Sequence, residues 1–401
     1  MRNPAGVGPG PGMAAACVSL FAYATAVFIT PSLNNELARS FEASLGMLGQ
    51  FPMVLMAGFL LGILLTAWVT DRVGKLPVMV VGNLLIAAGA LLFGASVDLP
   101  TARLASLVVG VGGGLSEPAA MALVTDLYDD ARRTSMANLS QAMFSVGAVA
   151  SPLAVGGMLD TGVDWRVGYQ VVAAVSVVGA LLSLVAAVRG VGRLHVPRSS
   201  PAPDAPDAAG AAAWLTPTLA WLSLGIALYV GAEISQSTWQ SVLLERELGA
   251  SPALAAAGLS LLWAGLAVGR LAVSAVARHL DDVTILRWAL GLGTLFQAAL
   301  ILSPGPASAL CVSFLLGLCF GPVFPTIVSK ATSARPGRSG AIMAVVVASG
   351  ALGAAFFPVG IGLAADQVGL RPALWACVAL LALNAAIFWR MAVPRKSPAS
   401  M

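Results

Sequence analysis

A single glutamate stands in the middle of a long apolar stretch of the sequence. Residues 103–125 (RLASLVVGVGGGLSEPAAMALVT) are long enough to cross the roughly 30 Å hydrocarbon core of a bilayer as a helix, and Glu117 is the one ionisable residue in their interior. A charge at that depth costs on the order of 2.5–3.5 kcal/mol, so the side chain should face protein or a water-filled cavity. Glu117 is then either a proton carrier on a transport pathway or a protonated, hydrogen-bonded part of a helix bundle.

A second carboxylic acid, Glu233, lies in another apolar stretch, residues 217–241. Polar side chains recur there at i, i+4, i+7, i+8 and i+11, which places them on one face of a helix: Tyr229, Glu233, Gln236, Ser237 and Gln240. In a membrane, such a face points toward a cavity or a partner helix. It therefore binds the hydroxyl groups of a solute, or it supplies interhelical hydrogen bonds worth roughly 0.6 kcal/mol each.

Further polar and aromatic residues extend the candidate site. Asn138 and Gln141 share a helical face within residues 136–158. Amides donate and accept hydrogen bonds, and aromatic rings cover the apolar face of a sugar, a role open to Trp263 beside simple packing. We predict that Glu117 and Glu233 couple protons. We predict that eight residues bind the solute: Tyr23, Asn34, Asn138, Gln141, Tyr229, Gln236, Gln240 and Trp263.

The composition excludes several classes of protein. Hydrophobic residues make up 58% of the 401 residues and charged residues 10%, against about 25% charged in soluble proteins. The four cysteines lie in apolar segments at no metal-ligand spacing, and the sequence has no phosphate-binding loop and no nucleophile–base pair. We therefore expect no enzymatic activity, no metal and no cofactor apart from coupling protons. The expected partners are a small-molecule solute and the lipid bilayer, not nucleic acid, and we expect a monomer.

Apolar stretches of membrane-spanning length occur twelve times, which predicts an all-α membrane protein with twelve transmembrane helices. Their approximate limits are 13–33, 45–69, 77–96, 103–125, 136–158, 167–188, 217–241, 253–276, 285–303, 307–329, 340–363 and 373–392. Sixteen Lys and Arg residues fall on the side of the termini against five on the other side, so we expect a plasma-membrane protein with both termini cytoplasmic. Arg270 lies toward the cytoplasmic end of its helix, as an anchor or a gating contact.

The two halves of the chain repeat. Tyr23 recurs as Tyr229 at an offset of 206, and Gly110 recurs as Gly317 at an offset of 207. Between the halves lies the stretch RSSPAPDAPDAAGAAA, whose composition is typical of a flexible linker. We predict two pseudo-symmetric six-helix bundles, residues 1–190 and 215–401, joined by a cytoplasmic linker, residues 191–214. A six-plus-six repeat is typical of a secondary transporter with its site between the halves.

The connection between the second and third stretches, AWVTDRVGK (67–75), resembles the signature loop of the major facilitator superfamily, with Ala67 in place of the usual first glycine. The run GAVASPLAVGG (147–157) is similar to the proline–glycine motif of that superfamily, with one residue of extra spacing. The resemblance extends over nearly the whole chain and implies the major-facilitator fold. It also implies that Asp71 and Arg72 form a cytoplasmic latch that gates the transport cycle.

Three segments resemble the fucose-permease-like sugar–proton symporters: GGGLSEPAA (112–120), GAEISQSTW (231–239) and GLCFGPVFP (317–325). This resemblance implies a proton-coupling carboxylate at Glu117. It also implies an aspartate near the outer end of the first helix, where this chain has Asn35. The resemblance therefore implies a sugar-like solute but does not indicate fucose itself.

The sequence as a whole predicts a proton-coupled symporter that moves a small polar solute by alternating access. The alternative is an efflux pump that exchanges protons for drugs or metabolites, because the proline–glycine run also resembles that of drug exporters. A transporter-shaped sensor without flux is a third interpretation. Moving one charge through 100 mV supplies ~2.3 kcal/mol, enough for roughly 40-fold accumulation of the solute.

Overall fold

The computed structural model describes residues 10–191, 216–276, 280–333 and 339–391, and the regular structure in these ranges is helical throughout. Twelve helical spans are long and apolar enough to cross a membrane, which confirms the predicted number. The chain is therefore an all-α, multi-pass membrane protein. The predicted linker lies outside the described residues except for Val191, so its boundaries stay a prediction.

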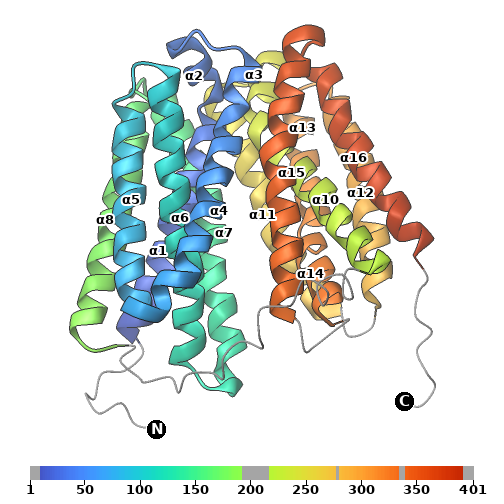
Figure 1. Ribbon diagram of the computed structural model, residues 1–401. Coiled ribbons are helices and arrows are strands. Elements are labelled where there is room, and N and C mark those ends of the chain that lie inside the picture. Colours follow the sequence, from blue (N-terminus) through green and yellow to red (C-terminus); the bar gives the residue numbers. More distant parts are fainter. Residues whose placement is uncertain (1–9, 192–215, 277–279, 334–338, 392–401) are drawn as a thin grey trace, which may run out of the picture.

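Six spans belong to each half of the chain (Figure 1). The first half contains α1 (Gly10–Ser32), the short helices α2 (Asn34–Ser40) and α3 (Leu45–Leu48), α4 (Gln50–Val73), α5 (Lys75–Gly94), α6 (Leu99–Leu127), α7 (Asp130–Asp160) and α8 (Arg166–Val188). The second half contains α10 (Pro217–Val242) with a terminal π-helical turn η1 (Leu243–Glu247), α11 (Pro252–Val276), α12 (Asp282–Ile301), α13 (Pro306–Phe320), α14 (Val323–Ser333), α15 (Ser339–Val368) and α16 (Leu370–Arg390).

The tenth span differs from the prediction because it is broken. The sequence predicts one helix over 307–329, but α13 ends at Phe320 and α14 begins at Val323. The break falls at Gly321 and Pro322. Proline has no amide hydrogen to donate and its ring clashes with the preceding turn, so a helix is interrupted or kinked there.

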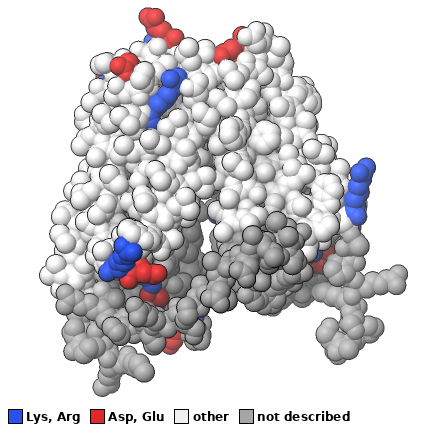
Figure 2. Space-filling view, in the orientation of Figure 1, with Lys and Arg blue, Asp and Glu red and all other residues white. Residues whose placement is uncertain are grey.

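The outer surface suits a lipid environment. Large apolar side chains are exposed on both halves, among them Leu64, Trp68, Leu271 and Leu295. Figure 2 shows few charged side chains on this face, most of them toward the two ends of the molecule. Because all backbone groups in a bilayer need internal partners, helices with such an apolar exterior are one of two structures that can span it.

Glycine pairs bring helices within each half into direct backbone contact, at equivalent places in the two repeats. A Cβ atom on Gly110 of α6 would lie 2.1 Å from the Leu55 carbonyl oxygen of α4. A Cβ atom on Gly317 of α13 would lie 2.0 Å from the Leu262 carbonyl oxygen of α11. Small residues allow this close packing where no hydrophobic driving force joins the helices. The two halves of the chain thus repeat the same helix–helix contacts as well as the same sequence positions.

We expect Gly110→Val and Gly317→Val each to destabilise the folded protein by about 1–3 kcal/mol or more, because the added atoms force two backbones apart. The matched control is Gly157→Val on α7, where an added Cβ meets nothing within 4 Å. Thermal unfolding in detergent measures the difference. Equal midpoints for Gly110→Val and Gly157→Val would contradict the packing described.

The two halves meet at one end of the molecule, the end that carries α2 and α3 (Figure 1). There α7 packs on α11, α15 packs on α3 and on the start of α4, and α1 packs on α10. We call this the closed end. At the opposite end α1 begins and α16 ends, and Figure 2 shows the surface hollowed between the halves toward it. We call this the open end.

Candidate functional site

Glu117 lies inside the first bundle, at the middle of α6, and its side chain is half-buried. Its hydrogen-bond partner is the side chain of Gln141 on α7. The buried Tyr23 of α1 is close enough for the Glu117 charge to act on its hydroxyl group. Among the described residues, no Lys or Arg forms an ion pair with Glu117. The structure thus brings three predicted site residues together around an acid without a counter-charge.

Packing fixes the position of Tyr23. Its ring stacks on Phe59 of α4, with 5.5 Å between the ring centroids and planes 5° apart. The ring also packs on the backbone of Gly113, where an added Cβ would lie 2.0 Å from the Tyr23 ring. Any side chain at Gly113 therefore displaces the ring. Gly113 is a residue of the site that the sequence analysis does not single out, because a glycine among many carries no distinguishing signal.

Glu233 has a different environment, in the second bundle. It is buried, with the Tyr229 hydroxyl group as hydrogen-bond partner and the guanidinium charge of Arg270 acting on it. Tyr229 donates to the Phe320 carbonyl oxygen at 2.8 Å, at the end of α13. Arg270 forms no ion pair within the described part of the chain, and its Nε is buried without an acceptor. The two acids therefore differ, since a cation lies near Glu233.

The glutamines of α10 lie inside the second bundle. Gln236 accepts a hydrogen bond from Gln297 Nε2 of α12 at 2.6 Å and donates to Gln240. Gln240 in turn donates to Ser313 Oγ of α13 at 2.5 Å. All four side chains are fully buried. The structure thus favours the second interpretation of this face, interhelical hydrogen bonding, over solute binding by Gln236 and Gln240. Gln297 and Ser313 give no periodic signal in the sequence.

Trp263 joins the two halves through aromatic contacts. It lies on α11, and its ring centroid is 4.2 Å from that of Phe28 on α1. Phe28 contacts Phe144 of α7, which also contacts Tyr23. The indole Nε1 of Trp263 is buried without a hydrogen-bond acceptor in the described residues. Trp263 is thus part of the interface between the halves, and its free donor remains available to a solute.

Asn34 and Asn138 lie toward opposite ends of the molecule. Asn34 is buried and donates from Nδ2 to the Thr238 carbonyl oxygen of α10 at 2.6 Å, so it connects the halves at the closed end. Asn138 is exposed, one helical turn from Gln141 toward the open end. Asn34 thus connects the two halves, and solute binding by Asn34 and by Asn138 stays a prediction.

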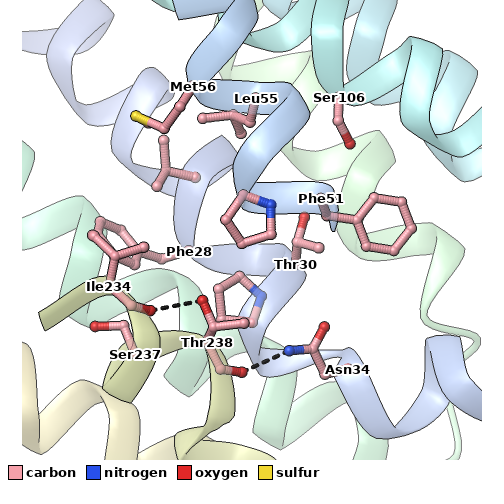
Figure 3. Close-up of a pocket in the computed structure, with 13 residues that line it drawn as sticks. Phe28, Thr30, Asn34, Phe51, Leu55, Met56, Ser106, Ile234, Ser237 and Thr238 are labelled. Carbon is pink, nitrogen blue, oxygen red and sulfur yellow. Dashed lines mark hydrogen bonds between the residues drawn. The ribbon is translucent and has the colours of Figure 1, made fainter. Parts of the chain in front are cut away.

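A pocket separates the aromatic contacts from the closed end (Figure 3). Its empty volume is ≈ 540 Å³, and it lies between α1, α4 and α6 of the first half and α10 of the second. Figure 3 shows the Asn34–Thr238 hydrogen bond at its edge and Phe28, Phe51 and Leu55 in its walls. Ser237 also lines it, and its hydroxyl group has no hydrogen-bond partner among the described residues. The pocket thus borders the contacts that join the two halves at the closed end.

A carboxylate from one half caps a helix of the other at the closed end. Asp366 of α15 accepts hydrogen bonds from Ser44 Oγ at 2.7 Å and from the amides of Leu45 and Gly46 at 2.9 Å each. A negative charge at a helix N-terminus is favourable. Its repeat equivalent Asp160 is exposed and has no such bond in the described residues. The sequence analysis gives Asp366 no role, because a contact over 320 positions has no local signal.

Asn35 forms a second bridge at the closed end. Its Nδ2 donates to Glu245 Oε2 at 2.9 Å, and its Oδ1 accepts from Arg246 Nε at 2.7 Å. Arg39 adds an ion pair with Glu245 at 3.0 Å. An amide can bond an acid and a base at once, whereas an aspartate would repel Glu245. This gives a physical reason for asparagine at the position where the resemblance implies aspartate.

The predicted latch residues make no contact with the described residues of the second half. Asp71 and Arg72 are exposed at the open end of α4, and the Arg72 guanidinium carbon lies 3.7 Å from the ring centroid of Trp68 on the same helix. Lys75 pairs with Asp126 of α6 within the first half. In the described residues the latch is thus unengaged, and its gating role stays a prediction.

Twelve spans, two repeated bundles and a seam closed at one end define a membrane transporter of the secondary-carrier class. Residues 15–358 match the family described as Major Facilitator Superfamily, so the chain belongs to that superfamily. This confirms the superfamily resemblance found in the sequence, while the fucose-permease-like subgroup stays a prediction.

Several known proteins are similar over almost their whole length. "Protein TsgA" of Escherichia coli O157:H7 is 25% identical over 374 residues, covering 91% of each chain. A TsgA homolog of Erwinia tasmaniensis is 22% identical over 361 residues, covering 89% of each. Among solved structures, a bacterial homolog of the human lysosomal transporter Spinster has a TM-score of 0.79 at 17% identity, covering 94% and 95%. A D-xylose-proton symporter has a TM-score of 0.75 at 12% identity, covering 95% and 97%. The structures support the fold.

Proposed function

We propose that this protein is a proton-coupled carrier that moves a small polar solute across the plasma membrane by alternating access. The observation that carries the proposal is the placement of Glu117 and Glu233. Both acids lie at membrane depth, neither is turned toward lipid, and each is hydrogen-bonded to a side chain that the sequence predicts in the site. Ionisable groups at that depth are typical of proton relays.

The surroundings of the two acids differ. Beside Glu233, Tyr229 donates its hydroxyl proton to the Phe320 carbonyl oxygen, and the Arg270 charge acts on the carboxyl group. The proposal gives Glu117 the main coupling role, because no Lys or Arg among the described residues pairs with it, and an acid without a counter-charge must be neutral when shielded from water.

The closed end corresponds to the outside and the open end to the cytoplasm, following the distribution of Lys and Arg. In this orientation the structure is open inward. Opening outward requires release of the Asp366 and Asn35 contacts and engagement of the open end, where Asp71 and Arg72 are exposed and would form the latch.

The proposed direction is symport, with uptake of a sugar-like solute. A second candidate is efflux by proton antiport, because the proline–glycine run of α7 lies in the closed seam, where a Cβ on Gly156 would lie 2.9 Å from Ala253 Cα of α11. Symport and antiport use the same fold, so an experiment must determine whether the solute moves with the protons or against them.

A thermal-shift screen of sugars, polyols and small drugs on purified protein identifies a solute, which is then tested in proteoliposomes under an imposed pH gradient. We expect the solute to accumulate inside the vesicles when the outside is more acidic than the inside, because protons and solute then move inward together. Accumulation inside when the outside is more alkaline would support antiport instead. Saturable binding without any movement of solute would contradict transport and favour a sensor.

A further inference from the structure

Arg270 lies on the side of α11 that faces the first half. Trp263 and Arg270 are seven residues apart, two turns of a helix, and so share one face. Trp263 contacts Phe28 of the other half. The Arg270 side chain therefore projects toward the seam between the halves, about 10 Å nearer the open end than Trp263.

The guanidinium group of Arg270 has no anion bound to it in the described residues. Its Nε is buried without an acceptor, and no carboxylate lies within ion-pair distance. Glu233 is near enough for the Arg270 charge to act on it, but the two side chains form no ion pair in the described residues. A buried charged donor without an acceptor is costly, so this arrangement is suited to an anion that arrives from outside the chain.

Resting on the proposed transport function, we propose that Arg270 binds an anionic group of the solute, so that the solute is a small polar acid bearing a carboxylate or a phosphate. The planar guanidinium group matches both groups with two parallel hydrogen bonds. Tyr229 is near enough for the Arg270 charge to act on its hydroxyl group. The unpaired indole Nε1 of Trp263 offers one further donor on the same helical face, for a neutral oxygen of the solute.

Binding of an anion by Arg270 also gives Glu233 a role in coupling. While Glu233 is protonated, it does not compete with the solute for Arg270. When Glu233 loses its proton, the carboxylate becomes an alternative partner for Arg270 and displaces the anion. The proton and the anionic solute would then bind together and leave together, which is symport of a proton with an acid.

The test compares matched ligands on the purified, delipidated full-length protein. Glucose, glucuronate and glucose 6-phosphate share one ring and differ in charge, and vesicle-free phosphatidylglycerol in detergent provides a lipid phosphate. We expect glucuronate or glucose 6-phosphate to raise the unfolding temperature and glucose to leave it unchanged. We expect Arg270→Gln to weaken binding of that acid at least tenfold. Arg390→Gln, at the exposed end of α16, should bind the acid as the wild type does.

Arg270→Lys keeps the charge but not the paired geometry, and we expect intermediate binding. It also provides a folded variant if Arg270→Gln does not fold. Tighter binding of glucose than of either acid would overturn the proposal, as would unchanged acid binding in the Arg270 variants or a response to phosphatidylglycerol alone. Accumulation of neutral glucose under a pH gradient would leave the proposed transport function standing while removing this inference.

Discussion

Replacing Glu117 with glutamine is expected to abolish proton-driven accumulation while exchange of solute across the membrane stays measurable. Glutamine has nearly the same shape and retains a hydrogen bond to Gln141, but it has no proton to exchange. A driving force of 100 mV supports roughly 40-fold accumulation for one coupled charge, so the expected change is from that level to none. Uptake of labelled solute under an imposed gradient, and counterflow without a gradient, measure the two activities in the same proteoliposomes.

The control for this prediction is Glu42→Gln. Glu42 is an exposed acid between α2 and α3, outside the candidate site. The variant should retain both activities. Equal loss of accumulation and exchange in Glu117→Gln would mean that the residue is structural, which is the alternative interpretation of an acid within this helix.

Removing the carboxylate of Asp366 is expected to open the closed end. Asp366→Ala eliminates three hydrogen bonds between the halves, two of them to backbone amides of α3. Hydrogen bonds to charged groups contribute about 1.5–3 kcal/mol when shielded, and partial exposure of this site reduces the effect. We expect the equilibrium to shift on the order of tenfold toward the outward-open state.

A cysteine at Ser237 reports this opening, because Ser237 is buried in the pocket above the Phe28–Trp263 contact. In a background without the native cysteines, a maleimide should modify Ser237→Cys about tenfold faster when Asp366→Ala is present. Asp160→Ala is the matched control, since this repeat equivalent makes no comparable bond in the described residues. Equal acceleration by both substitutions would show that the Asp366 contacts do not hold the end closed.

Features with a helical or repeat period could be predicted from the sequence. The twelve spans follow from apolar length, and the glycine contacts of Gly110 and Gly317 follow from an offset that recurs in the chain. Glu117 and its neighbour Gln141 were predicted for the site because each is polar within an apolar helix. The grouping of Tyr229 with Glu233 follows from their spacing of four residues along α10.

Features that depend on which helices meet could not be predicted. The polar face of α10 divides between three directions: Gln236 and Gln240 face α12 and α13, Glu233 faces Arg270 of α11, and Ser237 faces the first half. The spacing of residues in the sequence predicts which face of a helix they share. Which other helices contact that face is determined by the packing of the whole chain. The same limit applies to Asp366 and Ser44, whose partners are far away in the chain. The break between Phe320 and Val323 likewise divides a segment that apolar length alone predicts as one helix.

The central claim is that solute and proton cross the membrane together through the site around Glu117. The most direct measurement is the pH of a weakly buffered suspension of proteoliposomes, without an imposed membrane potential, when solute is added outside. We predict that the external medium becomes alkaline as solute enters, and that Glu117→Gln removes this signal while solute still equilibrates. Entry of solute into wild-type vesicles without any pH change would contradict the account.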